Sequence, residues 1–160
     1  MQQFLERKGN PRYELVGDVN LRNRKNIFNL GNLVRVDGDL DLFKSSIQSL
    51  ESLEYVAKSL NLTYTPIQSL GNLKYVGGYL DLIGSSIQSL GNLEYVGGTL
   101  HLHDTPIQSL GALEYVGGYL RLDGTSIKSL GNLNNVRHRI VLSSDHQIPE
   151  EQLTKFEIEY

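Results

Sequence analysis

The feature that most constrains this chain is a unit of twenty residues that recurs without insertions along most of its length. Its cleanest copy, LDLIGSSIQSLGNLEYVGGT, runs from Leu80 to Thr99. Further copies begin at Leu40, Leu60, Leu100 and Leu120. A strict repeat of this length predicts a solenoid, in which each turn, here called a rung, contacts only its neighbours. The repeat therefore says more about architecture than about function, which in solenoids depends on a few surface positions.

Apolar residues recur at six positions of the unit, numbered from its first leucine. In the rung from Leu80 they are Leu80, Leu82, Ile87, Leu90, Leu93 and Val96. The first two alternate with a polar residue, which predicts a strand with one buried face. The other four are spaced by three, which predicts turns or short 3₁₀ segments that face the same core. Stacked rungs would then form a repeat solenoid with a parallel β-sheet on one face.

Glycine recurs at unit positions 12, 18 and 19, as in Gly91, Gly97 and Gly98. These glycines predict either backbone angles that other residues resist or a close approach between rungs. A phosphate-binding loop is the alternative. The recurrence in rung after rung argues against it, as does the absence of a following Lys-Ser/Thr pair.

The ends of the chain depart from the repeat, which divides it into three expected parts. These are an N-terminal cap over residues 1–18, about seven leucine-rich-repeat-like rungs over 19–142, and a C-terminal cap over 143–160. The segment Tyr13 to Asp18 looks like a degraded copy of the YVGG segment. In the tail, Pro149 precedes two acidic residues, and Leu153 and Phe156 lie three apart, which predicts a short capping helix. Such caps cover the open ends of a solenoid core.

The composition narrows the class of protein. The chain has 160 residues, a net charge of -3 and no cysteine. Without cysteine there are no disulfides, thiolate metal sites or cysteine nucleophiles, and the composition suits a reducing compartment. No stretch approaches the roughly 18 apolar residues that span a membrane, and no signal peptide is evident, so we expect a cytoplasmic protein with no membrane partner. The slight acidity argues against nucleic acid as a partner.

The repeat resembles a known family. The pattern L-x-x-L-x-x-V-x-x-x-L-x-L-x-x-[ST]-x-I-x-x-L resembles the leucine-rich repeat, with Ser or Thr where that family usually has Asn. The short period and the V-G-G-x-L-x-L segment also resemble the receptor L domain and its bacterial relatives. The resemblance implies a solenoid that binds another macromolecule, and it fits a bacterial or phage origin. It also implies that the Ser or Thr hydroxyl bonds the backbone of the neighbouring rung, as Asn does.

Gln at position 9 and Tyr at position 16 are each kept in four of five rungs. The residues are Gln48, Gln68, Gln88 and Gln108, and Tyr55, Tyr75, Tyr95 and Tyr115. Identical side chains repeated along a sheet or turn predict ladders that stack or bond with one another. The functional alternative is that a flat ladder binds carbohydrate or an ice-like lattice.

Other unit positions vary strongly, and three of them (20, 2 and 4) alternate with the buried leucine pair. Their side chains should face outward on one sheet surface, here called the strand face, with position 5 at its edge. Drift at exposed sites is one explanation. Aromatic residues such as Tyr79 and Tyr119 argue for a protein-binding surface, because aromatic and Arg residues are favoured interface anchors. The predicted surface comprises Asp41, Phe43, Tyr64, Tyr79, Asp81, Ile83, His101, His103, Tyr119, Arg121, Asp123 and Arg139.

The sharpest chemical cluster is His101-Leu102-His103-Asp104. The two imidazoles should lie on one face about 7 Å apart. Together with Asp123 on the next rung, they offer three ligands of the kind that an open zinc site uses. Ordinary cross-strand pairs, His103 with Asp123 and His101 with Asp81, explain the same residues without metal. We therefore expect no metal and no cofactor, with these three residues as weak metal candidates only.

These observations predict a non-enzymatic protein-binding module that acts through its strand face. No nucleophile–base pair recurs, so no catalytic residues are expected. A small protein of this kind acts most plausibly by occlusion, as an inhibitor or adaptor of a larger partner. The alternatives are a carbohydrate-binding solenoid, a metal-dependent site at His101 and His103, and a homo-oligomer formed through the end rungs.

Overall fold

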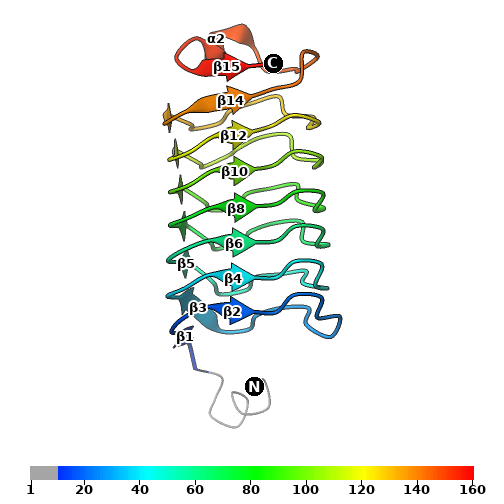
Figure 1. Ribbon diagram of the computed structural model, residues 1–160, viewed down its shortest axis with the longest axis vertical. Helices are drawn as coiled ribbons and strands as arrows, with labels where there is room; N and C mark the ends of the chain where they lie inside the picture. The colour runs from blue at the N-terminus through cyan, green and yellow to red at the C-terminus, as the bar shows by residue number, and fades with distance from the viewer. Residues whose placement is uncertain (1–10) are drawn as a thin grey trace.

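The structure is a computed structural model that describes residues 11–160. The first ten residues of the expected N-terminal cap lie outside the described residues. The chain winds into a column of stacked turns, with the first rungs at one end and a short helix at the other (Figure 1). The predicted repeat solenoid with a parallel sheet is therefore confirmed.

The rungs build two parallel sheets. The L-x-L strands form the larger sheet, which consists of β2 (Val19–Asn20), β4 (Leu40–Asp41), β6 (Leu60–Asn61), β8 (Leu80–Asp81), β10 (Leu100–His101), β12 (Leu120–Arg121), β14 (Arg139–Val141) and β15 (Glu157–Glu159). The second sheet consists of β1 (Tyr13–Leu15), β3 (Leu33–Val36), β5 (Tyr55–Val56), β7 (Tyr75–Val76), β9 (Tyr95–Val96), β11 (Tyr115–Val116) and β13 (Asn135–Val136). Through the regular rungs, each residue pairs with the residue twenty positions later, as Leu80 does with Leu100.

The second sheet was not expected. It forms at the Tyr-Val positions, where the Ala57 N–H donates to the Val36 carbonyl at 2.9 Å and the Gly77 N–H donates to the Val56 carbonyl at 3.0 Å. Most of these strands are only two residues long, so the sequence carries no alternating pattern that marks them. The remaining apolar positions, such as Ile87, Leu90 and Leu93, lie outside the strands, in segments next to the turns and to the isolated bridges that polar residues such as Ser89 form. No 3₁₀ segment occurs within residues 11–160.

One hydrophobic core runs through the stack. In the rung from Leu80 all six apolar residues are at most 2% exposed. Each buried Leu or Ile contributes roughly 1.5–3 kcal/mol. A rung must offset the ordering of twenty residues at about 1–2 kcal/mol each for the backbone alone. A single rung cannot do this, so the stability of the fold is collective.

The recurrent glycines have two distinct causes. At position 12 the backbone is left-handed, as at Gly111 with φ +56°, although Glu51 adopts a similar angle at the same place. Gly91 combines this angle with crowding, since a Cβ there would lie 2.4 Å from the Gly71 carbonyl oxygen. At position 18 the cause is crowding, because a Cβ on Gly97 would lie 2.1 Å from the carbonyl oxygen of Gly77. The central rungs therefore approach each other closely at this corner, whereas Ala57 and Arg137 occupy the same unit position in the outer rungs.

The two ends of the column are built differently. At the N-terminal end β1 pairs with β3, which confirms that Tyr13 to Asp18 is a degraded copy of the repeat. At the C-terminal end the predicted helix is present as α2 (Glu150–Leu153), directly after Pro149. Ile148 and Leu153 are buried against the last rungs. The chain then returns as β15 alongside β14, a strand that the sequence pattern did not predict.

Candidate binding surface

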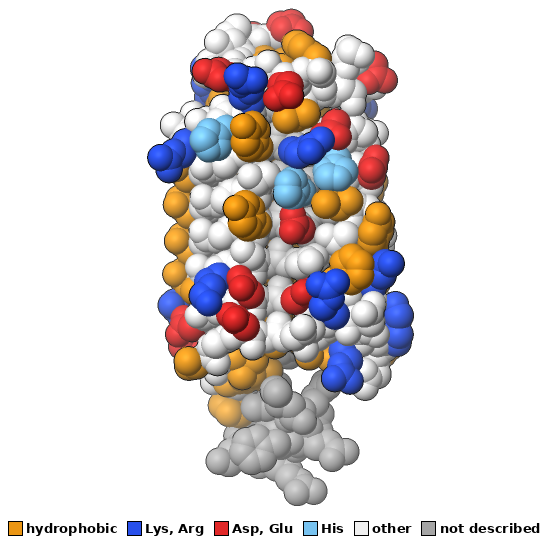
Figure 2. Space-filling view, viewed as in Figure 1, with side chains coloured by type: hydrophobic (Ala, Val, Ile, Leu, Met, Phe, Trp, Pro, Cys, Tyr) orange, Lys and Arg blue, Asp and Glu red, His pale blue; other side chains and the backbone are white. Residues whose placement is uncertain are grey.

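The strand face is the outward surface of the larger sheet. The predicted alternation holds along it, because Leu80 and Leu82 are fully buried while Asp81 between them is partly exposed. Hydrophobic, basic and acidic side chains are interspersed on this face, with two histidines close together near its centre (Figure 2). Tyr79 is 56% exposed and Tyr119 is 43% exposed, so two large aromatic rings project into solvent.

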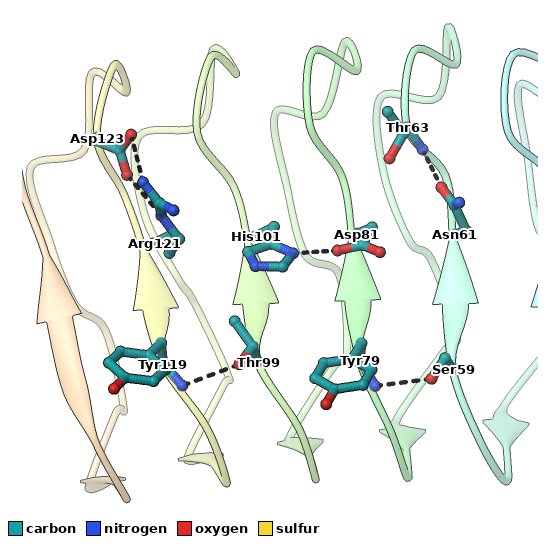
Figure 3. A network of polar contacts seen from close by, with 10 residues as sticks. All are labelled: Ser59, Asn61, Thr63, Tyr79, Asp81, Thr99, His101, Tyr119, Arg121 and Asp123. Atoms are coloured by element: carbon teal, nitrogen blue, oxygen red, sulfur yellow. Dashed lines mark hydrogen bonds and ion pairs between the residues drawn. The ribbon is translucent and has the colours of Figure 1, made fainter.

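At the centre of the face, one predicted pair forms and the other does not. The His101 imidazole Nδ1 contacts the Asp81 carboxylate across the sheet, as expected. Asp123 instead accepts hydrogen bonds from Arg121 on its own rung, at 3.3 Å from Nε (Figure 3). The expected pair of His103 with Asp123 is therefore wrong. The Arg121 guanidinium lies along its own strand and donates to the Asp123 carboxylate, which was the expected partner of the His103 imidazole.

The histidine cluster is not assembled as a metal site. The His101 and His103 rings lie edge to face with centroids 6.0 Å apart. The acids on the neighbouring rungs are already paired, Asp81 with His101 and Asp123 with Arg121. Within residues 11–160 no group of three or more His, Cys, Asp or Glu side chains gathers where it could hold a metal ion. The weak metal candidates His101, His103 and Asp123 are thus not brought together as ligands.

The N-terminal part of the strand face carries an aromatic cluster with cationic side chains close to its rings. The Phe43 and Tyr64 rings meet edge to face at 6.2 Å. The Arg22 guanidinium lies 4.4 Å from the Phe43 ring centroid, and the Lys44 Nζ lies within 5.5 Å of both rings. Gly84 makes room for Tyr64, because a Cβ there would lie 2.5 Å from the tyrosine ring. This part of the predicted surface is therefore held in place by contacts within the chain.

Small polar residues at position 20 have a structural role. The Ser59 Oγ accepts a hydrogen bond from the Tyr79 N–H at 3.1 Å, and the Thr99 Oγ1 accepts one from the Tyr119 N–H at 3.3 Å (Figure 3). At position 2, the Asn61 Oδ1 accepts a hydrogen bond from the Thr63 N–H at 3.0 Å. The variable positions thus divide into residues that bond the backbone of their own or the next rung and residues that project from the face.

The repeated tyrosines of the second sheet form a stacked ladder, here called the tyrosine ladder. It comprises Tyr55, Tyr75, Tyr95 and Tyr115. Successive ring centroids lie 4.6–4.8 Å apart and the rings are nearly parallel. The Arg35 guanidinium covers the first ring at 3.9 Å. The interpretation as a structural ladder is confirmed.

The stacking also weakens the carbohydrate alternative. Sugars bind aromatic residues through the ring faces, and inside the ladder each face lies against the next ring.

Burial, together with Tyr55 and Tyr95 on either side, raises the pKa of Tyr75 above its ordinary value. The Tyr75 phenol therefore holds its proton more tightly in the folded ladder than in an unfolded chain.

Sequence reasoning missed a second period of forty residues. In the first four regular rungs the pairs at unit positions 6 and 7 alternate as Ser45-Ser46, Thr65-Pro66, Ser85-Ser86 and Thr105-Pro106, and the fifth rung ends the alternation with Thr125-Ser126. The hydroxyls of Thr65 and Thr105 donate to carbonyls of their own rungs, at 2.7 and 2.6 Å, and not to the neighbouring rung as expected. The Ser45 and Ser85 hydroxyls are buried without a partner among the described residues. Comparing alternate rungs would have revealed this double period.

A shallow depression of about 460 Å³ lies by the start of the tyrosine ladder, away from the strand face. Its lining residues are Arg12, Tyr13, Glu14, Val34, Arg35, Glu54 and Tyr55. Arg12 pairs with Glu54, and Arg35 pairs with Asp37 beside it. Both guanidinium groups of the depression are therefore already neutralised by carboxylates of the same chain.

Comparison with known proteins found no matching family model, no matching curated protein and no matching solved structure. No helix in residues 11–160 has the length and apolar character needed to cross a membrane. The sequence and structure together show a parallel β-solenoid with a period of twenty residues and two sheets. Aromatic side chains are exposed on the outward face of the larger sheet.

Proposed function

We propose that this protein is a non-enzymatic binding module that holds another protein against its strand face. The proposal rests on the exposure of Tyr64, Tyr79 and Tyr119 on or beside a single face of an otherwise regular column. Exposed aromatic residues on a flat and rigid surface are typical of protein-binding sites, where Tyr and Arg are favoured anchors. Charged residues around them, such as the Arg121–Asp123 pair, suit the polar rim of an interface.

The likeness of the repeat to leucine-rich repeats supports the same proposal, since that family binds proteins through its sheet. We propose that the protein acts by occlusion, as an inhibitor or adaptor that covers part of a larger partner. We further propose that it works in the cytoplasm of a bacterium or of a phage-infected cell. The cysteine-free composition is compatible with that setting.

The test compares partner capture by three forms of the full chain. The first is the natural protein, and the second is Tyr79→Ala/Tyr119→Ala on the strand face. The third is Lys74→Ala/Gln88→Ala, which removes two exposed side chains from other sides of the column. Each form is immobilised and exposed to an extract of the source organism, and the retained proteins are identified by mass spectrometry.

We expect one partner to be retained by the natural protein and by the control variant, and to be lost from the strand-face variant. Loss of an interface anchor costs about 2 kcal/mol or more, which is roughly thirtyfold in Kd. Circular dichroism must show that all three forms are folded. Retention of the same proteins by all three forms would refute the assignment to the strand face.

A further inference from the structure

Two tyrosines occupy the same unit position on alternate rungs of the strand face. Tyr79 precedes β8 and Tyr119 precedes β12, with Thr99 on the rung between them. Both rings lean in the same pose toward the next rung of the column (Figure 3). The two tyrosines therefore present equivalent aromatic surfaces, and their surroundings can be compared directly.

The next rung differs between the two, because Gly97, Gly98 and Thr99 stand at the unit positions that Arg137, His138 and Arg139 occupy after Tyr119. The ring of Tyr119 is stacked against the imidazole of His138 from the next rung, with centroids 5.0 Å apart and an angle of 28° between the rings. The residue equivalent to His138 one double repeat earlier is Gly98, which has no side chain. The ring of Tyr79 consequently lacks the imidazole that covers Tyr119, and it is the more exposed of the two.

Gly98 packs closely against the backbone of the preceding rung. A Cβ on Gly98 would lie 2.9 Å from the Gly78 carbonyl carbon and 3.0 Å from the Tyr79 amide nitrogen. A side chain at position 98 would therefore require the backbone to move. The surface beside the Tyr79 ring therefore consists of the main chain of Gly78 and Gly98, without side chains.

The amide beside this surface is also a candidate contact. Along position 20, the N–H groups of Ser59, Tyr79 and Tyr119 each donate to a side-chain oxygen of the preceding rung. Thr99 interrupts this series. The residue at the same position of the preceding rung is Tyr79, which has an aromatic ring where Asp39, Ser59 and Thr99 have a side-chain oxygen. The Thr99 N–H, a donor without such a side-chain acceptor, thus lies next to the uncovered ring of Tyr79.

We propose that the uncovered face of Tyr79, above Gly98, is a stacking site for an aromatic side chain of the partner protein. The imidazole of His138 on Tyr119 is the internal model for the bound group, because it occupies the equivalent place in the same pose. Offset stacking of two flat rings suits this geometry. The inference rests on the proposed function and specifies one anchor that the partner must supply.

The test titrates the full chain with N-acetyltryptophanamide and follows the backbone amides by NMR. N-acetylleucinamide serves as the aliphatic control and methyl β-glucoside as the sugar control. We expect saturable ring-current shifts centred on the amides of Gly98 and Thr99 with the indole probe alone. Tyr79→Leu should abolish these shifts while leaving the rest of the spectrum in place.

His138→Ala supplies the matched gain of function, since it uncovers Tyr119 and leaves the Gly98 site untouched. We expect a second set of shifts, centred on the amides of residue 138 and Arg139, with an affinity within about threefold of the first site. The proposal is overturned if the indole shifts are absent or survive Tyr79→Leu, if either control probe produces them equally, or if His138→Ala adds no second set. Failure of the proposed function has a different signature, namely capture that is indifferent to the strand-face variant.

Discussion

At the scale of single residues, the two classes of glycine should respond differently to the same substitution. In Gly97→Ala the new Cβ meets a carbonyl oxygen at 2.1 Å, whereas around the Cβ position of Gly111 nothing lies within 4 Å and only the φ of +56° opposes a side chain. We expect Gly97→Ala to lower the free energy of unfolding by at least about 3 kcal/mol. Gly111→Ala should cost about 1 kcal/mol. Urea denaturation of both variants measures the difference, and equal costs would contradict the close approach of rungs at this corner.

The buried hydroxyls at position 6 offer a second test. The Thr105 hydroxyl donates to the Leu102 carbonyl at 2.6 Å, so Thr105→Val should cost about 1 kcal/mol. The Ser85 hydroxyl is buried without a partner among the described residues, so Ser85→Ala should be neutral or stabilising. Urea midpoints of the two variants give the answer. A larger loss in Ser85→Ala than in Thr105→Val would show that the serine hydroxyl has a partner, such as a buried water.

Residue identities within the core were predictable, because burial imposes a spacing that recurs in every rung. The partner of a surface charge was not predictable in the same way. His103 and Arg121 are both within reach of Asp123, and only side-chain conformation decides that the guanidinium takes it. The pair of Asp81 with His101 was predictable, because sheet register places the two residues side by side.

At the scale of elements, the tyrosine ladder makes stability depend on alkaline pH. The pKa of Tyr75 is raised by burial and by its tyrosine neighbours, so the folded state holds the phenolic proton more tightly than the unfolded chain. The stabilisation is complete below about pH 10, where the free phenol titrates. It is lost as the pH rises through the folded pKa, because the unfolded state then binds fewer protons than the native state.

Tyr75→Phe keeps the stacked ring and removes this proton. We expect its free energy of unfolding to fall less steeply between pH 9 and pH 11 than that of the natural protein. Urea denaturation across this range measures both slopes. Phe156→Leu, at a partly buried ring outside the ladder, is the control that should retain the natural slope. Identical slopes for Tyr75→Phe and the natural protein would contradict a raised pKa within the ladder.

Elements were predictable where the sequence marks them with alternation. The L-x-L strands have this mark, and the helix after Pro149 has its own signals of a proline and acidic first turn. The second sheet lacks it, since two-residue strands such as β7 show no period. β15 was missed for another reason: Glu157-Ile158-Glu159 pairs only because the tail folds back onto β14.

At the scale of the whole molecule, the C-terminal cap should decide whether the column stays monomeric. Deleting residues 147–160 removes Ile148 and Leu153 from the core and leaves β14 without its outer neighbour. An uncovered edge of a parallel sheet invites pairing with another copy. We expect dimers or larger aggregates in light scattering after size exclusion.

A point substitution separates loss of stability from loss of the edge. Leu153→Ala opens a cavity but keeps β15 in the sequence, so it should lower stability by about 2–5 kcal/mol without forming dimers. If the truncated chain remains a well-behaved monomer, the tail is not a cap.

The overall architecture followed from the repeat, because one strict period can satisfy its core only by stacking. The candidate surface followed in outline, since outward positions that vary are visible in a sequence with five internal copies. What the sequence could not reveal was which of those positions are free. Ser59 and Thr99 vary and face outward, yet their oxygens bond the next rung, whereas Tyr79 and Tyr119 project from it.

The most direct test of the strand face as the binding surface is site-specific photo-crosslinking in an extract of the source organism. A benzophenone amino acid replaces, one at a time, Tyr79, Tyr119, Lys74 or Gln88. All four residues are exposed. Tyr79 and Tyr119 lie on the strand face, and Lys74 and Gln88 lie on other sides of the column. We predict a crosslink to one and the same protein from positions 79 and 119, and none to it from positions 74 and 88. Crosslinks from position 74 or 88, with none from 79 or 119, would contradict the account.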